Sequence, residues 1–140
     1  FFNYFPVLTL NNPSDQIKRG QYLVEGPGHC GECHTPRNLL GGPKFGQWLA
    51  GAVNPEGEGV IQNITTGEGG IADWSESQLA SMLKDGFTPE FDSVGGSMTA
   101  VVANWSHVSD EDRAAVAAYL KAVPAHANGY PVLTKPAANQ

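Results

Sequence analysis

The chain has 140 residues, a length typical of one compact domain. Eight Lys and Arg against fourteen Asp and Glu give a net charge of −6, which argues against a nucleic-acid partner held through its phosphates. No apolar run reaches the ~20 residues that a membrane-spanning helix requires. Seventeen Gly and ten Pro indicate a loop-rich chain, whereas two Cys are too few for a multi-disulfide scaffold.

The two ends of the chain differ from its middle. Four of the first five residues are aromatic, so residues 1–13 are interpreted as an N-terminal extension. It is either the remnant of a membrane-interface anchor or a segment that packs back onto the domain. Residues 125–140 have no helical period and predict an extended C-terminal tail. The domain itself is expected over residues 14–124.

Three helices are predicted, over residues 14–25, 75–85 and 109–123, each starting at a serine that can cap the first turn. The second also carries Gln78 three residues after Ser75, the spacing of a capping box. No long alternating run indicates a strand, so the predicted fold class is mainly α.

Two long loops are predicted, over residues 35–73 and 87–108. Loops of this length are uncommon inside a compact domain unless they serve a function. We interpret them as segments that wrap a large buried ligand.

Residues 30–34 read Cys-Gly-Glu-Cys-His, the C-x-x-C-H pattern of covalent haem attachment. Cys30 and Cys33, three residues apart in a turn, can both form thioether bonds to the vinyl groups of one porphyrin. The imidazole of His34, the next residue, can then point at the iron as an axial ligand. The predicted cofactor is therefore one covalently attached haem c.

Three other interpretations of the motif remain open. A thioredoxin-like redox pair is expected after a β-strand, whereas a helix is predicted before Cys30. A zinc site needs four ligands, and the remaining histidines are scattered. A simple disulfide between Cys30 and Cys33 is the third possibility.

The sixth iron ligand is predicted to be Met98. It follows two glycines in a predicted loop, where the backbone can approach a flat ligand closely. Met82, the other methionine, falls on the apolar side of the second helix, where methionine is more often a core residue. His107 is the main rival as a ligand, followed by an open or water-ligated site.

These features resemble the class I c-type cytochromes. The resemblance implies a helical fold wrapped around one covalent haem, with the first and last helices crossing at Gly20 against Tyr119 or Leu120. It also implies that a proline carbonyl accepts the second ring N–H of the ligand histidine. Pro43 is the first choice for this acceptor and Pro36 the second.

Three segments resemble the haem domains of cytochrome subunits from bacterial membrane-bound alcohol, aldehyde and gluconate dehydrogenases. They are residues 19–38 around the motif, residues 63–75 and residues 86–98. The chain has a single C-x-x-C-H motif, whereas those subunits carry several.

In such a haem pocket, Asn63, Trp74 and Arg37 are expected to bind the haem propionates. For Trp74, a role as an ordinary core aromatic is the alternative.

The predicted function is that of a periplasmic electron carrier with no catalytic residues of its own. Its redox partners are expected to be a dehydrogenase or quinol-side donor and a terminal oxidase or other acceptor. Two alternatives remain: a haem enzyme or gas sensor with a displaceable sixth ligand, and a permanent electron-transfer subunit of a dehydrogenase complex. Residues 18–44 carry four basic and two acidic residues, whereas acidic residues gather at 73–92 and 110–112. If the basic set surrounds the haem edge, a partner with an acidic face is favoured, and a solvated mixed surface is the alternative.

Overall fold

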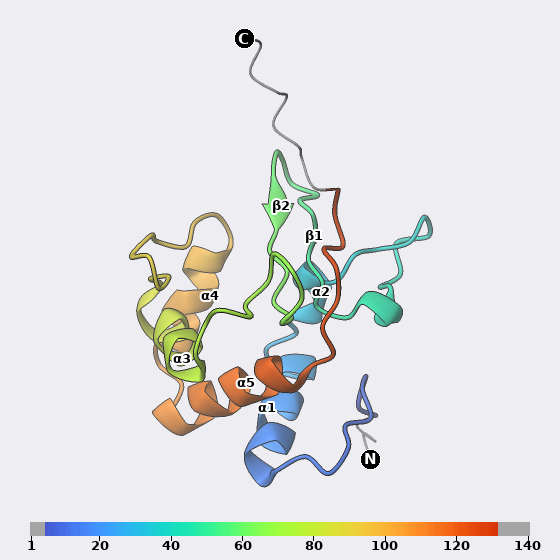
Figure 1. The fold of residues 1–140 in the computed structure, drawn as a ribbon. Helices are drawn as coiled ribbons and strands as arrows, with labels where there is room; N and C mark the ends of the chain where they lie inside the picture. Colours follow the sequence, from blue (N-terminus) through green and yellow to red (C-terminus); the bar gives the residue numbers. More distant parts are fainter. Residues whose placement is uncertain (1–4, 132–140) are drawn as a thin grey trace.

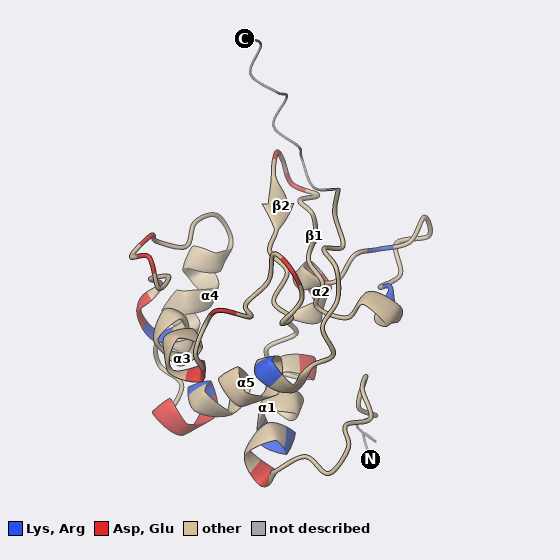
Figure 2. Cartoon of the chain, viewed as in Figure 1, with Lys and Arg blue, Asp and Glu red and all other residues tan. Residues whose placement is uncertain are grey.

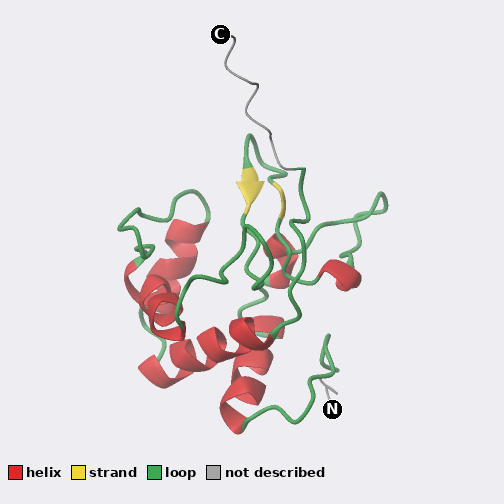
Figure 3. Ribbon diagram, in the orientation of Figure 1, coloured by secondary structure: helices red, strands yellow, loops and turns green. Residues whose placement is uncertain are grey.

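The computed structural model describes residues 5–131, which form helices joined by long loops (Figures 1 and 3). In chain order the elements are α1 (Asp15–Glu25), α2 (Gly31–His34), the 3₁₀ turn η1 (Phe45–Gln47), β1 (Ala52–Val53), β2 (Val60–Ile61), α3 (Glu76–Asp85), α4 (Met98–Trp105) and α5 (Asp110–Ala122). The two short strands form an antiparallel pair. The predicted mainly α class is confirmed.

The three predicted helix starts are confirmed by their caps. The hydroxyl of Ser14 accepts the backbone N–H of Ile17 at 3.2 Å, and Ser109 does the same at the start of α5. Ser75 and Gln78 form both bonds of a capping box. These contacts satisfy N–H groups that have no partner inside the helix, which is why each helix begins where it does.

The prediction of a loop throughout residues 87–108 is wrong, because residues 98–105 form α4. This helix has no side-chain cap at Ser97, and its sequence is apolar without a clear one-sided pattern. Its C-terminal end is held instead from α5, where the buried Arg113 donates to the carbonyls of Trp105 (2.9 Å) and Ser106 (3.2 Å). The stabilising contact is therefore tertiary and has no local sequence signal.

The first and last helices cross at Gly20, as the class I cytochrome resemblance implies (Figure 1). A Cβ atom at Gly20 would lie 1.9 Å from the carbonyl oxygen of Ala115 and 2.8 Å from Cβ of Tyr119. Only glycine allows α1 to approach the backbone of α5 this closely. At the edge of the crossing, Arg19 of α1 donates two hydrogen bonds to Asp112 of α5, at 2.9 and 3.0 Å.

The hydrophobic core is built around the crossing of α1 and α5. Helix α3 packs against α5, and α4 packs against α3. The largest side chains of the core that are less than 2% exposed are Tyr119, Leu49, Leu79, Val24 and Val116. No helix within residues 5–131 combines the length and apolar character needed to cross a bilayer.

The segments at both ends contact the helical core. The backbone N–H of Val7 donates to the carboxylate of Glu25, and the carbonyl of Leu8 accepts from Gln21. At the other end, the N–H of Gly129 donates to the carbonyl of Ala50. Residues 1–4 and 132–140 of the predicted extension and tail lie outside the described range.

We expect Gly20→Ala to lower the free energy of unfolding by about 3 kcal/mol, because the added methyl group has no room at the α1–α5 crossing. Denaturant unfolding of the purified protein measures this loss. Gly46→Ala is the matched control, since its Cβ would meet no atom within 4 Å, and its effect should stay within about 0.5 kcal/mol. Equal unfolding midpoints for the two variants would contradict the close crossing.

Candidate haem-attachment site

The C-x-x-C-H segment forms α2, a single helical turn that begins directly after Cys30. The N–H groups of Cys33 and His34 both bond to the carbonyl of Cys30, at 3.3 and 3.0 Å. Neither cysteine is in a disulfide. Cys33 is exposed, whereas Cys30 is partly buried, and burial raises the pKa of its thiol to about 11. The turn therefore presents two free thiols one helical turn apart.

Trp48 packs against this turn at Gly31, the residue directly after Cys30. A Cβ at Gly31 would lie 2.1 Å from the Trp48 ring, so the ring lies directly against the backbone of α2. The Trp48 indole N–H donates to the Tyr119 hydroxyl at 3.1 Å, and that hydroxyl donates to Glu25 at 2.8 Å. This chain of hydrogen bonds ties α2 to both α5 and α1. Sequence reasoning missed it, because Tyr119 lies 71 residues from Trp48 and no local pattern joins the two.

His34 is held in place through one ring nitrogen. Its Nδ1 lies 2.7 Å from the carbonyl oxygen of Gln62, directly after β2. Burial lowers the pKa of the imidazole, which favours the neutral form. A neutral ring that donates from Nδ1 leaves Nε2 as a lone-pair donor, the arrangement that metal-bound histidines adopt.

The prediction that Pro43, or else Pro36, accepts from His34 is wrong, because Gln62 occupies that role. The Pro36 carbonyl instead accepts the backbone N–H of Lys44 at 2.8 Å, and Pro43 pairs with Arg37 in an isolated β-bridge. The β1–β2 hairpin brings Gln62 to the histidine. A backbone carbonyl carries no residue-type signal, so the sequence could not single it out.

That Asn63 binds a haem propionate stays a prediction, and the structure shows its present partners. Asn63 is buried, and its amide group donates one hydrogen bond to the carbonyl of His126 and one to Asn128, both at 3.0 Å. Its oxygen accepts from the backbone and the hydroxyl of Thr65. Both N–H groups of the Asn63 amide thus have partners in residues 126–128. Asn63 instead anchors residues 126–128 beside the loop that carries Gln62.

The other two residues predicted to bind propionates lie in different surroundings. Arg37 is exposed, and its guanidinium donates to the carbonyls of Glu32 (3.1 Å) and Gly41 (2.7 Å), which ties the following loop to α2. Trp74 is partly buried against the core. Its indole N–H has no hydrogen-bond partner within residues 5–131, so it remains available to a ligand. Both assignments stay predictions.

The two methionines lie as their predicted roles require. Met82 packs against the core from α3. Met98 is the first residue of α4 rather than part of a loop, and it is partly buried. The rival ligand His107 is exposed beyond the end of α4. Figure 1 shows α4 on the left of the molecule and α2 near its middle, both above the α1–α5 crossing. Met98 as the sixth ligand stays a prediction.

The sequence profile of the cytochrome c family matches residues 17–124. The chain belongs to the cytochrome c family. Proteins of this family carry covalently bound haem c and transfer electrons. Cys30, Cys33 and His34 fit that group, because α2 offers two free thiols and a histidine whose pKa is lowered by burial.

Three curated relatives share this cytochrome c domain. One, named "Diheme cytochrome c-type", is from Cereibacter sphaeroides and is 59% identical over 77% of the chain and 36% of its own length. The fructose dehydrogenase cytochrome subunit of Gluconobacter japonicus is 40% identical over 81% and 23%. The cytochrome c subunit of the quinone-dependent alcohol dehydrogenase of Gluconobacter oxydans is 34% identical over 81% and 25%. The chain thus spans between about a quarter and about a third of these relatives.

We expect Tyr119→Phe to lower the free energy of unfolding by about 1–3 kcal/mol, because the hydroxyl that joins Trp48 to Glu25 is removed. Urea unfolding of the haem-loaded protein measures the change. The matched control is Tyr130→Phe, since the hydroxyl of Tyr130 has no hydrogen-bond partner in the described part of the chain. If both variants unfold like the wild type, the link does not support α2.

Proposed function

We propose that this cytochrome c domain carries one haem and passes single electrons in the periplasm. Cys30 and Cys33 would hold the haem through thioether bonds, with His34 and Met98 as axial ligands. The haem supplies the one-electron chemistry, and the protein supplies position, ligands and a docking surface. The observation on which this proposal rests is the geometry of His34. Its Nδ1 faces a carbonyl at 2.7 Å directly after two unbridged cysteines.

Each protein group has a distinct part in the proposed function. The Gln62 carbonyl fixes the tautomer and ring orientation of His34 and makes the imidazole a stronger donor. Met98 would close the other axial position, which leaves none for dioxygen or peroxide and favours electron transfer over substrate chemistry. Trp74 would donate its indole N–H to a haem propionate, and Arg37 would place positive charge nearby.

The proposed redox partners follow from the relatives. Two of those described above are named as cytochrome subunits of a fructose and an alcohol dehydrogenase, so we assign a dehydrogenase as electron donor. A terminal oxidase or other acceptor would take the electrons. The same names support a second arrangement, in which the domain is a permanent part of a dehydrogenase complex. Co-purification of a stable complex with a dehydrogenase would favour the second arrangement over a free carrier.

The test of the axial ligands replaces Met98 by alanine. We expect Met98→Ala to lose the methionine–iron charge-transfer band of the oxidised protein and to bind CO when reduced. Its reduction potential should fall on the order of 0.1 V, a fraction of the roughly 0.8 V range that axial ligands span. Optical spectroscopy and redox titration measure these changes.

Met82→Ala is the control, because Met82 packs in the core and its loss should leave the band and the potential unchanged. If instead the wild-type reduced protein binds CO at neutral pH, the sixth ligand is displaceable. The site would then be that of a haem enzyme or gas sensor rather than a carrier.

A further inference from the structure

The loop after the haem-attachment turn carries two adjacent leucines that face solvent. Leu39 is 106% exposed and Leu40 is 97% exposed. The loop is nevertheless ordered by its own hydrogen bonds, since the side-chain oxygen of Asn38 accepts the N–H groups of Leu40 and Gly42, both at 3.0 Å. Adjacent exposed apolar side chains with polar residues around them are the kind of patch that marks an interaction site.

Unpaired positive charge surrounds these leucines. Arg37 and Lys44 flank the loop, and neither has a carboxylate within 4.0 Å in the described part of the chain. By contrast, Lys18, Arg19, Lys84 and Arg113 each lie within that distance of an Asp. Arg37 also binds the Glu32 carbonyl at 3.1 Å, which fixes the loop to the turn that carries both cysteines. We call residues 37–44 the basic tip.

A second exposed loop has the opposite character. Phe91 is 85% exposed and Phe87 is 51% exposed, among the carboxylates of Asp85, Glu90 and Asp92. We call residues 85–92 the acidic tip. It too is ordered, because the Asp85 carboxylate accepts the N–H of Phe87 at 3.0 Å and the Thr88 hydroxyl accepts that of Asp92 at 3.2 Å.

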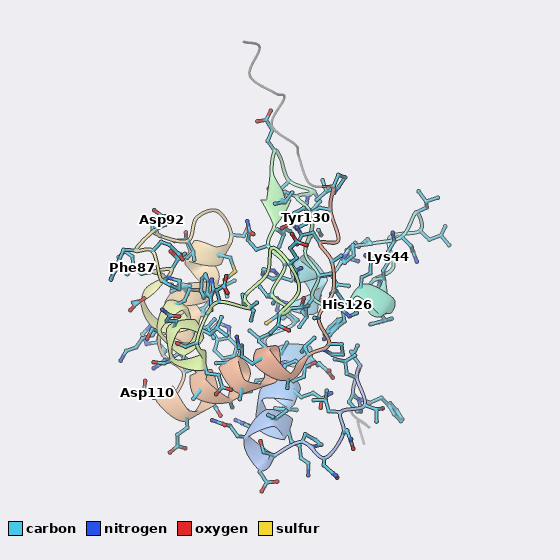
Figure 4. The ribbon with its side chains drawn as sticks, viewed as in Figure 1. Lys44, Phe87, Asp92, Asp110, His126 and Tyr130 are labelled. Atoms are coloured by element: carbon cyan, nitrogen blue, oxygen red, sulfur yellow. The ribbon has the colours of Figure 1, made fainter. Side chains whose placement is uncertain are left out.

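The two tips lie on opposite sides of the molecule. Figure 2 shows red residues gathered beyond α3 and α4 and blue residues on the loop beyond α2. Figure 4 labels Phe87 and Asp92 on the first side and Lys44 on the other. A single domain therefore cannot join its own tips. Two copies can join them, basic to acidic, with apolar side chains at the centre and opposite charges around them.

We infer that the basic tip of one copy of this cytochrome c domain docks on the acidic tip of another, head to tail. Resting on the proposed electron-transfer function, the contact would set the attachment turn of one domain beside the loop that leads to Met98 in the next. Each docked pair leaves one tip of each kind free, so further copies can add in the same sense. The contact is small, which suits a brief redox encounter.

The experiment uses two variants of the haem-loaded protein, each with one tip disabled. The first carries Leu39→Ser, Leu40→Ser and Lys44→Glu, and the second carries Glu90→Lys and Phe91→Ser. Concentration-dependent chemical shifts in ¹⁵N-correlated NMR spectra at low ionic strength report weak self-association. We expect each variant alone to self-associate at least about tenfold more weakly than the wild type.

Mixing the two variants is the decisive step, because each retains the tip that the other lacks. Association should recover in the mixture, with shifts confined to the intact acidic tip of the first and the intact basic tip of the second. It should weaken as salt is added. Lys18→Glu and Glu68→Lys serve as charge-matched controls, since both residues are exposed and lie outside the tips.

Three results would overturn the docking inference. They are a wild type that does not self-associate, single-tip variants that associate like the wild type, and a mixture that does not recover. Electron self-exchange between oxidised and reduced copies, measured on the same samples, tests the electron-transfer role separately. Intact docking with no acceleration of self-exchange would count against that role and leave the docking surface standing.

Discussion

One contact organises this molecule: the crossing of α1 and α5 at Gly20, where Tyr119 lies. Cβ of Tyr119 lies within 2.8 Å of where a Gly20 side chain would begin, so the tyrosine is positioned by backbone approach. Its hydroxyl continues from there to Trp48, whose ring lies against Gly31 of the attachment turn. The packing of α1 against α5 and the position of the haem-attachment turn therefore depend on the same set of contacts. A change at the crossing therefore shifts Trp48, the side chain against which α2 packs.

The histidine depends on a second, independent contact. Gln62 reaches it from the β1–β2 hairpin, and the next residue, Asn63, is held by the segment at 126–128. The acceptor for His34 is thus positioned by residues almost at the end of the described chain. Since a backbone carbonyl moves only with its loop, buried amide bonds from Asn63 are an effective way to keep the His34 bond short. Asn63 thereby fixes the loop that carries the acceptor for His34.

Sequence reasoning succeeded where the decisive groups are close together in the chain. The serine caps and the C-x-x-C-H turn each involve residues within about one helical turn, so their spacing carries the information. The crossing at Gly20 followed from the family resemblance. Gln62 and Trp48 have the opposite property, because each contacts a partner far along the chain, and α4 depends on a side chain of the next helix. Helix α4 has no side-chain cap at Ser97, and its C-terminal end is held by Arg113 of α5, so no residue within its own span predicted it.

The long loops, which looked excessive for a domain of this size, divide into parts with different duties. Residues 50–65 carry the acceptor for His34, whereas the two tips extend beyond the core and contribute no side chain to it. Both tips are ordered by local bonds from Asn38, Asp85 and Thr88, so their exposed apolar groups need no tertiary support. Arg37 links the basic tip to the haem-attachment turn through the Glu32 carbonyl at 3.1 Å. The net charge of −6 matters less than its placement, because Arg37 and Lys44 lie on the loop after α2 and the carboxylates of the acidic tip lie across the molecule. An electron carrier gains specificity from this asymmetry, since orientation in an encounter complex depends on the direction of the charge separation rather than on the total.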